Sequence, residues 1–333
     1  MQTGQRKGRT ALEEVEKGEF NRVDSGFRNW VKKGSEKFPP AKGRYHIYAS
    51  YACPWAHRCL IVRKLKGLTA AIGVSIVHPT WLQTRPGEDE HRGWTFKNDI
   101  QHKSGQATFH IEDVIPDPIQ NFQFIRDIYE QSNDQVGKYT VPILYDKETK
   151  QIVNNESSEI ILMLNSEFNE FAENPDMDLS HPENMKEELQ KLDNEIYENI
   201  NNGVYRCGFA TTQAAYEKAF NSLFESLDKI DKILGDKQFL AGDKLTISDI
   251  RLWVTLVRFD EVYVVYFKTN KKSIADYPNL LRFCKQIYQT DGVSETLNMT
   301  HIKTHYYTSH PALNTYGIIP IGPGFLEVLK QKL

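Results

Sequence analysis

The residue with the clearest chemical potential is Cys53, in the stretch HIYASYACPWAHRCL over residues 46–60. It ends an apolar, β-prone run and is followed at once by Pro54, which suits a first helical turn because its missing N–H has no partner there. A thiol at a helix N-terminus faces unpaired backbone N–H groups and the positive end of the helix dipole, which lower its pKa. His57 and Arg58 could add positive charge one turn later. The pattern therefore predicts a nucleophilic thiolate at Cys53.

The spacing argues against a two-cysteine site. Ala56 stands where the partner in a C-x-x-C motif would be, and Cys59 lies six residues beyond Cys53, about one and two-thirds turns along a helix. A zinc site would need further ligands of recognisable spacing. A buried structural cysteine remains an alternative. If Cys53 is a nucleophile, the thiol that resolves its product must come from solution, and glutathione is the obvious supplier.

Two later motifs could bind glutathione. In GKYTVPIL, a cis bond between Val141 and Pro142 would present the Val141 backbone N–H and C=O to an extended peptide, whereas an ordinary trans edge proline is the alternative. In NNESSEII, Glu156 and Ser157 could hold a γ-glutamyl amine and carboxylate, with helix N–H groups behind them. Plain helix capping by Glu156 and Ser157 is compatible with that role.

The elements around these residues predict a thioredoxin-like α/β domain. The alternating run 44–50 indicates a strand, a helix follows from Pro54 to about Gly67, and the apolar run 71–79 indicates a second strand. Such a short crossover implies a parallel pair. The rest of the β-α-β-α-β-β-α order comes from a helix over 121–132, strands in YTVPILYD and QIVNN, and a helix opening at Glu156. The long stretch between 83 and 120 predicts a functional or disordered loop.

The second half of the chain predicts an all-helical domain. Strand signals nearly vanish after the polar linker 171–184, and residues 211–234 show one apolar helical face. Thr246 and Asp249 are placed as a capping box. We therefore expect three parts, which are an N-terminal extension over 1–43, a thioredoxin-like glutathione-binding domain over 44–170 and an all-helical domain with a C-terminal tail over 185–333. Aromatic residues suggest that the extension packs on the body through Phe27 and Trp30.

The overall composition narrows the class of protein. The 333 residues carry a net charge of −3, without a basic excess that would favour nucleic acid or an anionic membrane. The four cysteines are too sparse for a disulfide framework. The first 20 residues lack the apolar segment of a secretory signal, and their acidic residues argue against a mitochondrial presequence. The apolar runs are too short to span a bilayer. These features favour a cytoplasmic protein.

Seven motifs, in order from about residue 46 to 322, resemble those of the glutathionyl-hydroquinone reductases, the xi class of glutathione transferases. They are S-x-x-C-P-W-A-H-R, G-W-T-F, T-V-P-I-L-x-D, V-N-N-E-S-S-E-I-I, N-N-G-V-Y-x-x-G-F-A, D-I-R-L-W-x-T-L-V-R-F-D and H-Y-Y-x-S-H. The resemblance implies the glutathione-transferase fold, with a thioredoxin-like domain first and a helical domain second, in a homodimer.

The resemblance also implies roles for particular residues. Cys53 matches the catalytic cysteine, with Pro54 and Pro142 as structural prolines. Lys138 stands where the family often has arginine, and lysine keeps the charge without bidentate carboxylate recognition. The implied glutathione-binding residues are Trp94, Lys138, Val141, Glu156 and Ser157, and the implied aromatic-substrate residues are Tyr205, Tyr263 and Tyr306. His301, His305 and His310 lack an acidic or cysteine partner, so no metal is expected.

The activity implied is reduction of S-glutathionyl-hydroquinones through a mixed disulfide between Cys53 and glutathione, with glutathione as co-substrate and oxidised glutathione as product. The sequence alone indicates an activated thiol beside a glutathione site. Two alternatives stay open. One is an omega-like thioltransferase or dehydroascorbate reductase that uses the same thiol. The other is a non-catalytic binding module on the same fold.

Overall fold

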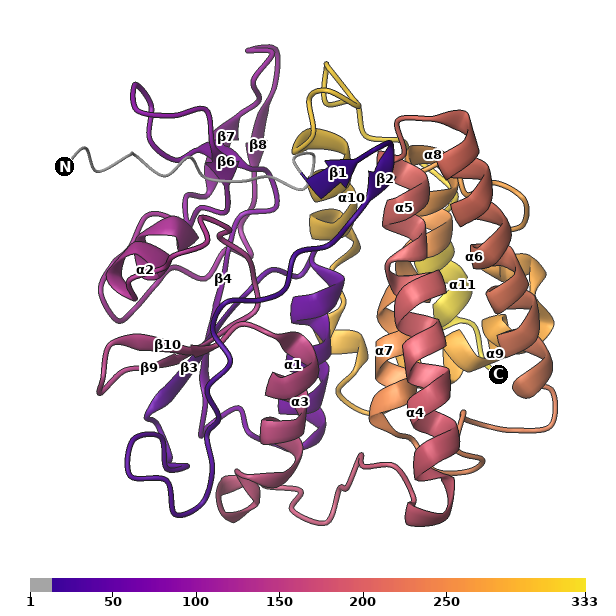
Figure 1. Cartoon of the computed structure of the whole chain (residues 1–333), viewed down its shortest axis with the longest axis horizontal. Coiled ribbons are helices and arrows are strands. Elements are labelled where there is room, and N and C mark those ends of the chain that lie inside the picture. The colour runs from indigo at the N-terminus through magenta and orange to yellow at the C-terminus, as the bar shows by residue number, and fades with distance from the viewer. Residues whose placement is uncertain (1–13) are drawn as a thin grey trace. The chain divides into compact units, whose positions relative to one another are not determined.

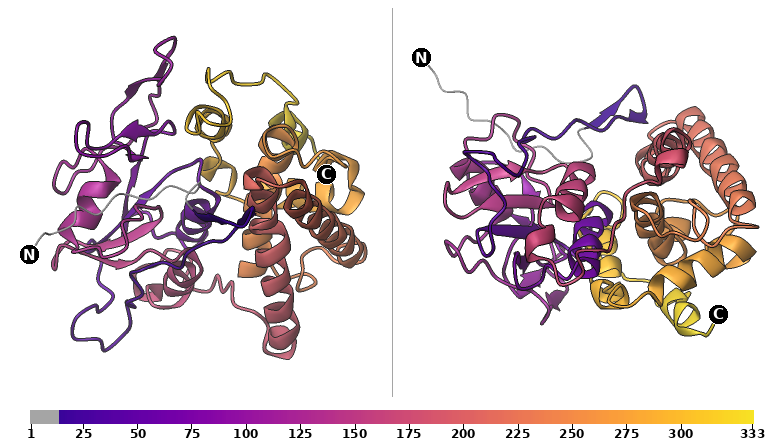
Figure 2. Two further views of the ribbon diagram at one scale, coloured as in Figure 1. Left: turned by 45° about the horizontal axis from the view of Figure 1, so that its top comes forward. Right: turned by 90° about the horizontal axis from the view of Figure 1, so that it is seen from below.

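The computed structural model describes residues 14–333, which fall into two compact units. Within those residues, the first unit comprises 23–175 and 300–319, and the second comprises 14–22, 176–299 and 320–333. Figure 1 labels their helices and strands, and Figure 2 gives two further views. No helix in this described part of the chain is both long and apolar enough to cross a membrane.

The first unit is built on a four-stranded mixed sheet of order β10-β9-β3-β4. β3 and β4 are parallel, and both β3–β9 and β9–β10 are antiparallel. The strands are β3 (Tyr45–Ala49), β4 (Gly73–Ile76), β9 (Ile143–Asp146) and β10 (Gln151–Asn154). The helices are α1 (Pro54–Leu65), α2 (Ile125–Gln131), α3 (Ser157–Ser166) and α10 (Met299–Thr308), with a 3₁₀ turn at Asn169–Phe171.

The burial of this sheet explains the apolar, β-prone pattern by which its strands were predicted. Every residue of β3 is buried, as expected of an inner strand covered on both faces. α1 and α3 pack against each other, and they lie side by side in both figures. The predicted order of elements and the parallel β3–β4 pair are confirmed.

The segment from 83 to 120 differs from the predicted loop. It contains most of two small antiparallel hairpins, one of β5 (Leu82–Gln83) with β6 (Arg92–Gly93) and one of β7 (Asp99–Gln101) with β8 (Thr108–His110). Strands of two or three residues are too short for an alternating pattern to identify them.

The second unit is mainly helical, as predicted. Its helices are α4 (Lys186–Glu195), α5 (Gly203–Phe209), α6 (Gln213–Ile233), α7 (Ile247–Arg258), α8 (Val264–Tyr266), α9 (Pro278–Tyr288) and α11 (Phe325–Lys330). Two π-helical turns, Ile196–Asn201 and Phe259–Tyr263, interrupt this regular structure. Single 3₁₀ turns lie at Glu183–Met185, Ile274–Asp276 and Ser294–Thr296. A short hairpin joins β1 (Val15–Glu16) to β2 (Glu19–Phe20).

The predicted capping box opens α7. The Asp249 carboxylate accepts hydrogen bonds of 2.8 Å from the backbone N–H and the hydroxyl of Thr246, and a third of 2.8 Å from the Leu240 N–H. These bonds satisfy backbone donors that a helix start leaves without partners. The helix then buries Trp253 completely, and the indole donates to the Cys284 carbonyl.

The extension is divided between the two units. Residues 1–13 of the predicted extension lie outside the described residues, residues 14–22 belong to the second unit, and the remainder belongs to the first. Phe27 packs edge-on against Tyr129 with ring centroids 5.8 Å apart, whereas Trp30 is 40% exposed. Residues 300–319, which the sequence placed in the helical domain, belong to the first unit. The boundaries at 43, 170 and 185 stay predictions.

Candidate functional site

Cys53 lies immediately before α1, as the sequence predicts. It is the N-cap residue in an extended conformation, and its carbonyl accepts the first helical hydrogen bond, 2.9 Å from the His57 N–H. The thiol Sγ lies 3.4 Å from the Val141 carbonyl oxygen, to which it donates. The peptide bond from Val141 to Pro142 is cis. With 8% of its surface exposed, Cys53 is nearly buried beside the segment predicted to bind a peptide backbone.

Glu156 and Ser157 form the N-terminus of α3. Glu156 is the N-cap residue, and its carboxylate accepts hydrogen bonds from the Ser158 N–H at 2.9 Å and the Ser25 hydroxyl at 3.3 Å. Arg58 of α1, which is 2% exposed, donates to the Ser157 hydroxyl at 3.4 Å. Arg58 therefore links the helix that follows Cys53 to the helix that starts at Ser157. The sequence suggested only a charge for Arg58, and it gave no signal for the role of Ser25.

Trp94 belongs to a cluster of aromatic rings in the first unit. Its ring stacks on His305 with centroids 4.6 Å apart and an interplanar angle of 26°, and Trp81 meets it edge-on at 5.6 Å. His305 Nδ1 lies 2.8 Å from the Pro79 carbonyl oxygen. Since a carbonyl only accepts, Nδ1 carries the hydrogen. The neighbouring Tyr306 is 1% exposed, and its ring centroid lies 5.2 Å from that of His305. Trp81 and His305 were not predicted as site residues.

The remaining predicted residues lie elsewhere in the two units. Lys138 donates from Nζ to the Val23 carbonyl oxygen at 3.2 Å, which is one of the three hydrogen bonds that an ammonium group can donate. Tyr205 and Tyr263 belong to the second unit, where their ring centroids are 6.2 Å apart. Tyr263 is fully buried and stacks on Phe267 with an interplanar angle of 9°, whereas Tyr205 is partly exposed.

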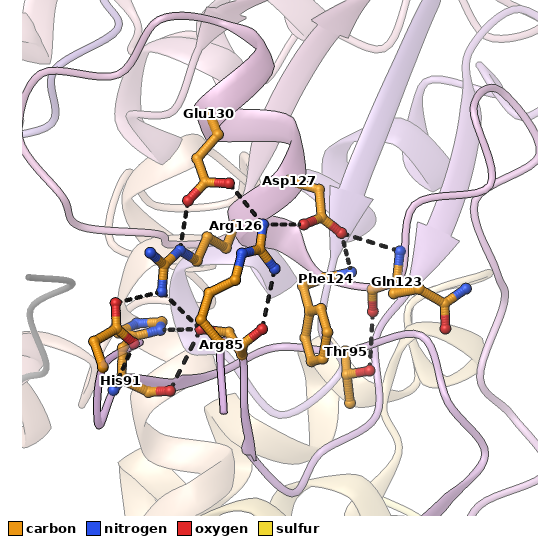
Figure 3. A network of polar contacts seen from close by, with 10 residues as sticks. Arg85, His91, Thr95, Gln123, Phe124, Arg126, Asp127 and Glu130 are labelled. Carbon is orange, nitrogen blue, oxygen red and sulfur yellow. Dashed lines mark hydrogen bonds and ion pairs between the residues drawn. The ribbon is translucent and has the colours of Figure 1, made fainter. Parts of the chain in front are cut away.

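A network of ion pairs holds the loop between β5 and β6, just before Trp94 (Figure 3). Arg85 contacts the carboxylates of Asp127 and Glu130 on α2, both at 2.6 Å. Arg126 of α2 contacts Asp89 of the loop at 2.7 Å and Glu130 at 2.6 Å. Two arginines and three carboxylates therefore connect the loop to α2. The Trp94 carbonyl also accepts from the Ile125 N–H at 3.1 Å, which ties the tryptophan itself to that helix.

Replacing Arg126 by methionine is expected to lower the free energy of unfolding by about 2 kcal/mol. The Arg126 and Asp89 side chains are 7% and 10% exposed, so the variant would leave a nearly buried carboxylate without its cation. The effect stays modest because Glu130 is 40% exposed and keeps its water. Denaturant titration would measure it, with Lys97→Met as an exposed control of equal charge change. Equal stability of the two variants would contradict a structural role for the network.

Two family models match the chain. Residues 52–167 match the N-terminal domain of glutathione S-transferase, and residues 213–286 match its C-terminal domain. The first match contains Cys53, Val141, Glu156 and Ser157.

Relatives and solved structures extend this similarity over nearly the whole chain. The glutathionyl-hydroquinone reductase YqjG of Escherichia coli is 44% identical over 315 residues, covering 92% of this chain and 89% of the relative. The crystal structure of the glutathione S-transferase Xi from Phanerochaete chrysosporium has a TM-score of 0.83 and 45% identity, covering 92% and 93% of the two chains. The glutathione-bound structure of YqjG has a TM-score of 0.80 and 42% identity, covering 90% and 94%.

Proposed function

Since this chain belongs to the xi-class glutathione transferases, the family of the glutathionyl-hydroquinone reductases, we propose that it reduces S-glutathionyl-hydroquinones to hydroquinones with glutathione as co-substrate. The observation that carries the proposal is the position of the Cys53 thiol. It lies at the start of α1, 3.4 Å from the carbonyl oxygen of Val141, the residue proposed to pair with the glutathione backbone. The glutathione-bound structure of YqjG supports the choice of thiol.

Glutathione is bound by backbone and side-chain groups of the first unit. The Val141 N–H and C=O pair with its peptide backbone in the manner of an added strand. Glu156 and Ser157 hold its γ-glutamyl amine and carboxylate at the N-terminus of α3. Trp94 packs beside it, and Lys138 supplies a positive charge for the glycyl carboxylate, as a point charge and without the fork geometry of arginine.

The reaction has two displacement steps. The Cys53 thiolate attacks the glutathione sulfur of the conjugate, the aryl carbon–sulfur bond breaks, and its electron pair takes up a proton on the ring carbon as the hydroquinone leaves. The thiolate of a second glutathione then attacks the Cys53–glutathione disulfide and releases oxidised glutathione and the Cys53 thiolate. The ring carbon is reduced from a carbon–sulfur to a carbon–hydrogen bond, and the thioether sulfur of the conjugate and the thiol of one glutathione become the two sulfurs of the disulfide.

Breaking an aryl carbon–sulfur bond requires the ring to accept a proton, which a keto-like tautomer makes easier. Tyr205, Tyr263 and Tyr306 are the phenols that the family resemblance assigns to the aromatic substrate, and a phenol that donates to a ring hydroxyl favours that tautomer. We further propose a cytoplasmic homodimer. An omega-like thioltransferase or dehydroascorbate reductase activity would use the same Cys53, and it would turn over simple mixed disulfides faster than the aryl conjugate.

Mass spectrometry tests the proposal directly. The full-length protein, incubated with S-(2,5-dihydroxyphenyl)glutathione, is expected to gain one glutathione on the peptide that contains Cys53 and to release one hydroquinone per chain. Added glutathione should then restore the unmodified mass and yield oxidised glutathione. An unmodified protein, or glutathione on Cys59, Cys207 or Cys284, would contradict the proposed chemistry.

A further inference from the structure

The β1–β2 hairpin packs on the aromatic cluster of the second unit. Phe20 is 2% exposed, and its ring centroid lies 6.2 Å from that of Tyr205 and 5.6 Å from that of Phe209. The Gly18 carbonyl accepts from the Thr211 N–H at 3.2 Å. Gly18 has a φ of +87°, and a Cβ there would lie 2.7 Å from a side-chain carbon of Thr212, so the turn requires glycine. The hairpin is therefore held against α5 and α6.

Arg22, two residues after β2, lies over the rings that this hairpin brings together. Its guanidinium carbon is 5.3 Å from the Tyr205 ring centroid and 5.4 Å from that of Phe20. Its Nε donates to the Asn202 side-chain oxygen at 3.0 Å, directly before α5. A guanidinium in this position is attracted to the negative face of an aromatic ring, and arginine remains charged at any physiological pH. The hydrogen bond to the Asn202 side-chain amide therefore holds the Arg22 guanidinium in this position.

The backbone around the two tyrosines is irregular. The π-helical turn Ile196–Asn201 directly precedes the residues that lead into α5 and Tyr205, and the second π-helical turn, Phe259–Tyr263, ends at the other tyrosine. π-helical turns in proteins occur frequently at functional sites. Asn201 donates to the Thr255 hydroxyl at 2.7 Å, so the irregular turn before α5 is anchored to α7. This hydrogen bond therefore holds the backbone that leads to Tyr205.

We propose that Arg22 is a specificity-determining residue that favours electron-rich aromatic rings at Tyr205. This inference rests on the proposed function, in which Tyr205 contacts the hydroquinone. A hydroquinone ring carries two electron-donating hydroxyls and ionises to a phenolate, and both properties strengthen its attraction to a fixed positive charge. An alicyclic diol of the same size and hydroxyl content lacks the ring electrons. The N-terminal segment therefore contributes to the choice of substrate and is more than a covering arm.

Binding of two matched probes to the full-length protein tests this role. Ligand-observed NMR, which suits millimolar affinities, would give the Kd of benzene-1,4-diol and of trans-cyclohexane-1,4-diol, with S-methylglutathione as a probe of the first unit. Arg22→Met is expected to raise the Kd of the aromatic diol at least fivefold, the factor for about 1 kcal/mol of cation–π attraction. The Kd of S-methylglutathione should stay within twofold. Arg22→Lys, which keeps the charge, should recover most of the affinity.

The matched control is Arg206→Met, which removes the same charge from the residue after Tyr205. Arg206 pairs with Glu198 on the exposed side of α5, and its loss should leave all three affinities unchanged. Three results would overturn the inference. The first is that Arg206→Met raises the Kd of the aromatic diol as much as Arg22→Met does, and the second is that Arg22→Met leaves that Kd unchanged. The third is that the unmodified protein binds both diols equally well. A missing Cys53 adduct would instead overturn the proposed function while leaving this binding result intact.

Discussion

Replacement of Cys53 by serine is expected to lower kcat/KM for a glutathionyl-hydroquinone at least a thousandfold, to the background rate. A serine hydroxyl stays protonated at neutral pH and cannot form a disulfide with glutathione, so the first displacement step has no nucleophile. The change replaces a sulfur by an oxygen and removes no other atom of the side chain. Glutathione binding should therefore persist, and the loss should fall on kcat. Steady-state kinetics with the purified full-length variant would measure both.

Cys59→Ala is the matched control, because Cys59 lies on the same helix and is fully buried. Burial raises the pKa of the Cys59 thiol well above its usual value, with the neighbouring Arg58 acting in the opposite direction, so Cys59 remains a neutral thiol. Its loss should leave kcat/KM within a few fold, although the small cavity lowers stability. Comparable activity of Cys53→Ser and the unmodified protein, or loss of activity in Cys59→Ala alone, would refute the assignment of the nucleophile.

The fold and the place of Cys53 were predictable because their signals are local. A proline after a β-prone run marks a helix start, and the Thr246–Asp249 spacing marks another, so both appear in a single stretch of sequence. The parallel β3–β4 pair follows because a single helix joins the two strands, which is the usual connection of a parallel pair. The helix caps and strand patterns therefore predicted the elements that carry Cys53 and the N-terminus of α3 at Glu156 and Ser157.

The parts that could not be predicted depend on contacts between distant segments. The stacking of His305 on Trp94 joins residues more than 200 positions apart, and Arg22 reaches Tyr205 from a hairpin whose strands are two residues long. No periodicity or capping pattern records such pairs. The same cause explains why residues 300–319 fall in the first unit. Most residues of α10 are buried, but nothing in the sequence of this helix shows which unit covers it.

Acidification is expected to unfold the first unit between about pH 6 and pH 4. Burial lowers the pKa of five of its histidines to about 4, namely His46, His78, His91, His301 and His310. In the unfolded chain these groups titrate near 6.5. As the pH falls below that value, the unfolded state binds protons that the native state does not, so the free energy of unfolding decreases. At pH 4, the extra proton binding of the unfolded state at each histidine would lower the free energy of unfolding by up to about 3 kcal/mol. Two or three such histidines would therefore offset the total stability of a typical domain.

The second unit should resist this change. Burial raises the pKa of Asp249 and Asp260 to about 6, with their hydrogen bonds from backbone N–H groups acting against it. A carboxyl whose pKa is raised in the folded state contributes stability that is present at low pH and is lost as the pH rises through about 6. The two units therefore respond to acid with opposite signs. The first should lose its structure while the helical second unit keeps most of its own.

Fluorescence and circular dichroism can follow the two units separately during a pH titration. Trp30, Trp55, Trp81 and Trp94 lie in the first unit and Trp253 in the second, so tryptophan emission reports mainly on the first, and the far-ultraviolet signal reports mainly on the helices. His78→Asn keeps an acceptor for the Thr80 N–H, which His78 Nδ1 accepts at 2.9 Å, but removes one titrating group. It should lower the acid midpoint and reduce the proton uptake on unfolding by about one proton. The control is His110→Asn, which replaces an exposed histidine that contacts Asp99. Coincident transitions for both signals, or equal slopes in the two variants, would show that buried histidines do not control acid unfolding.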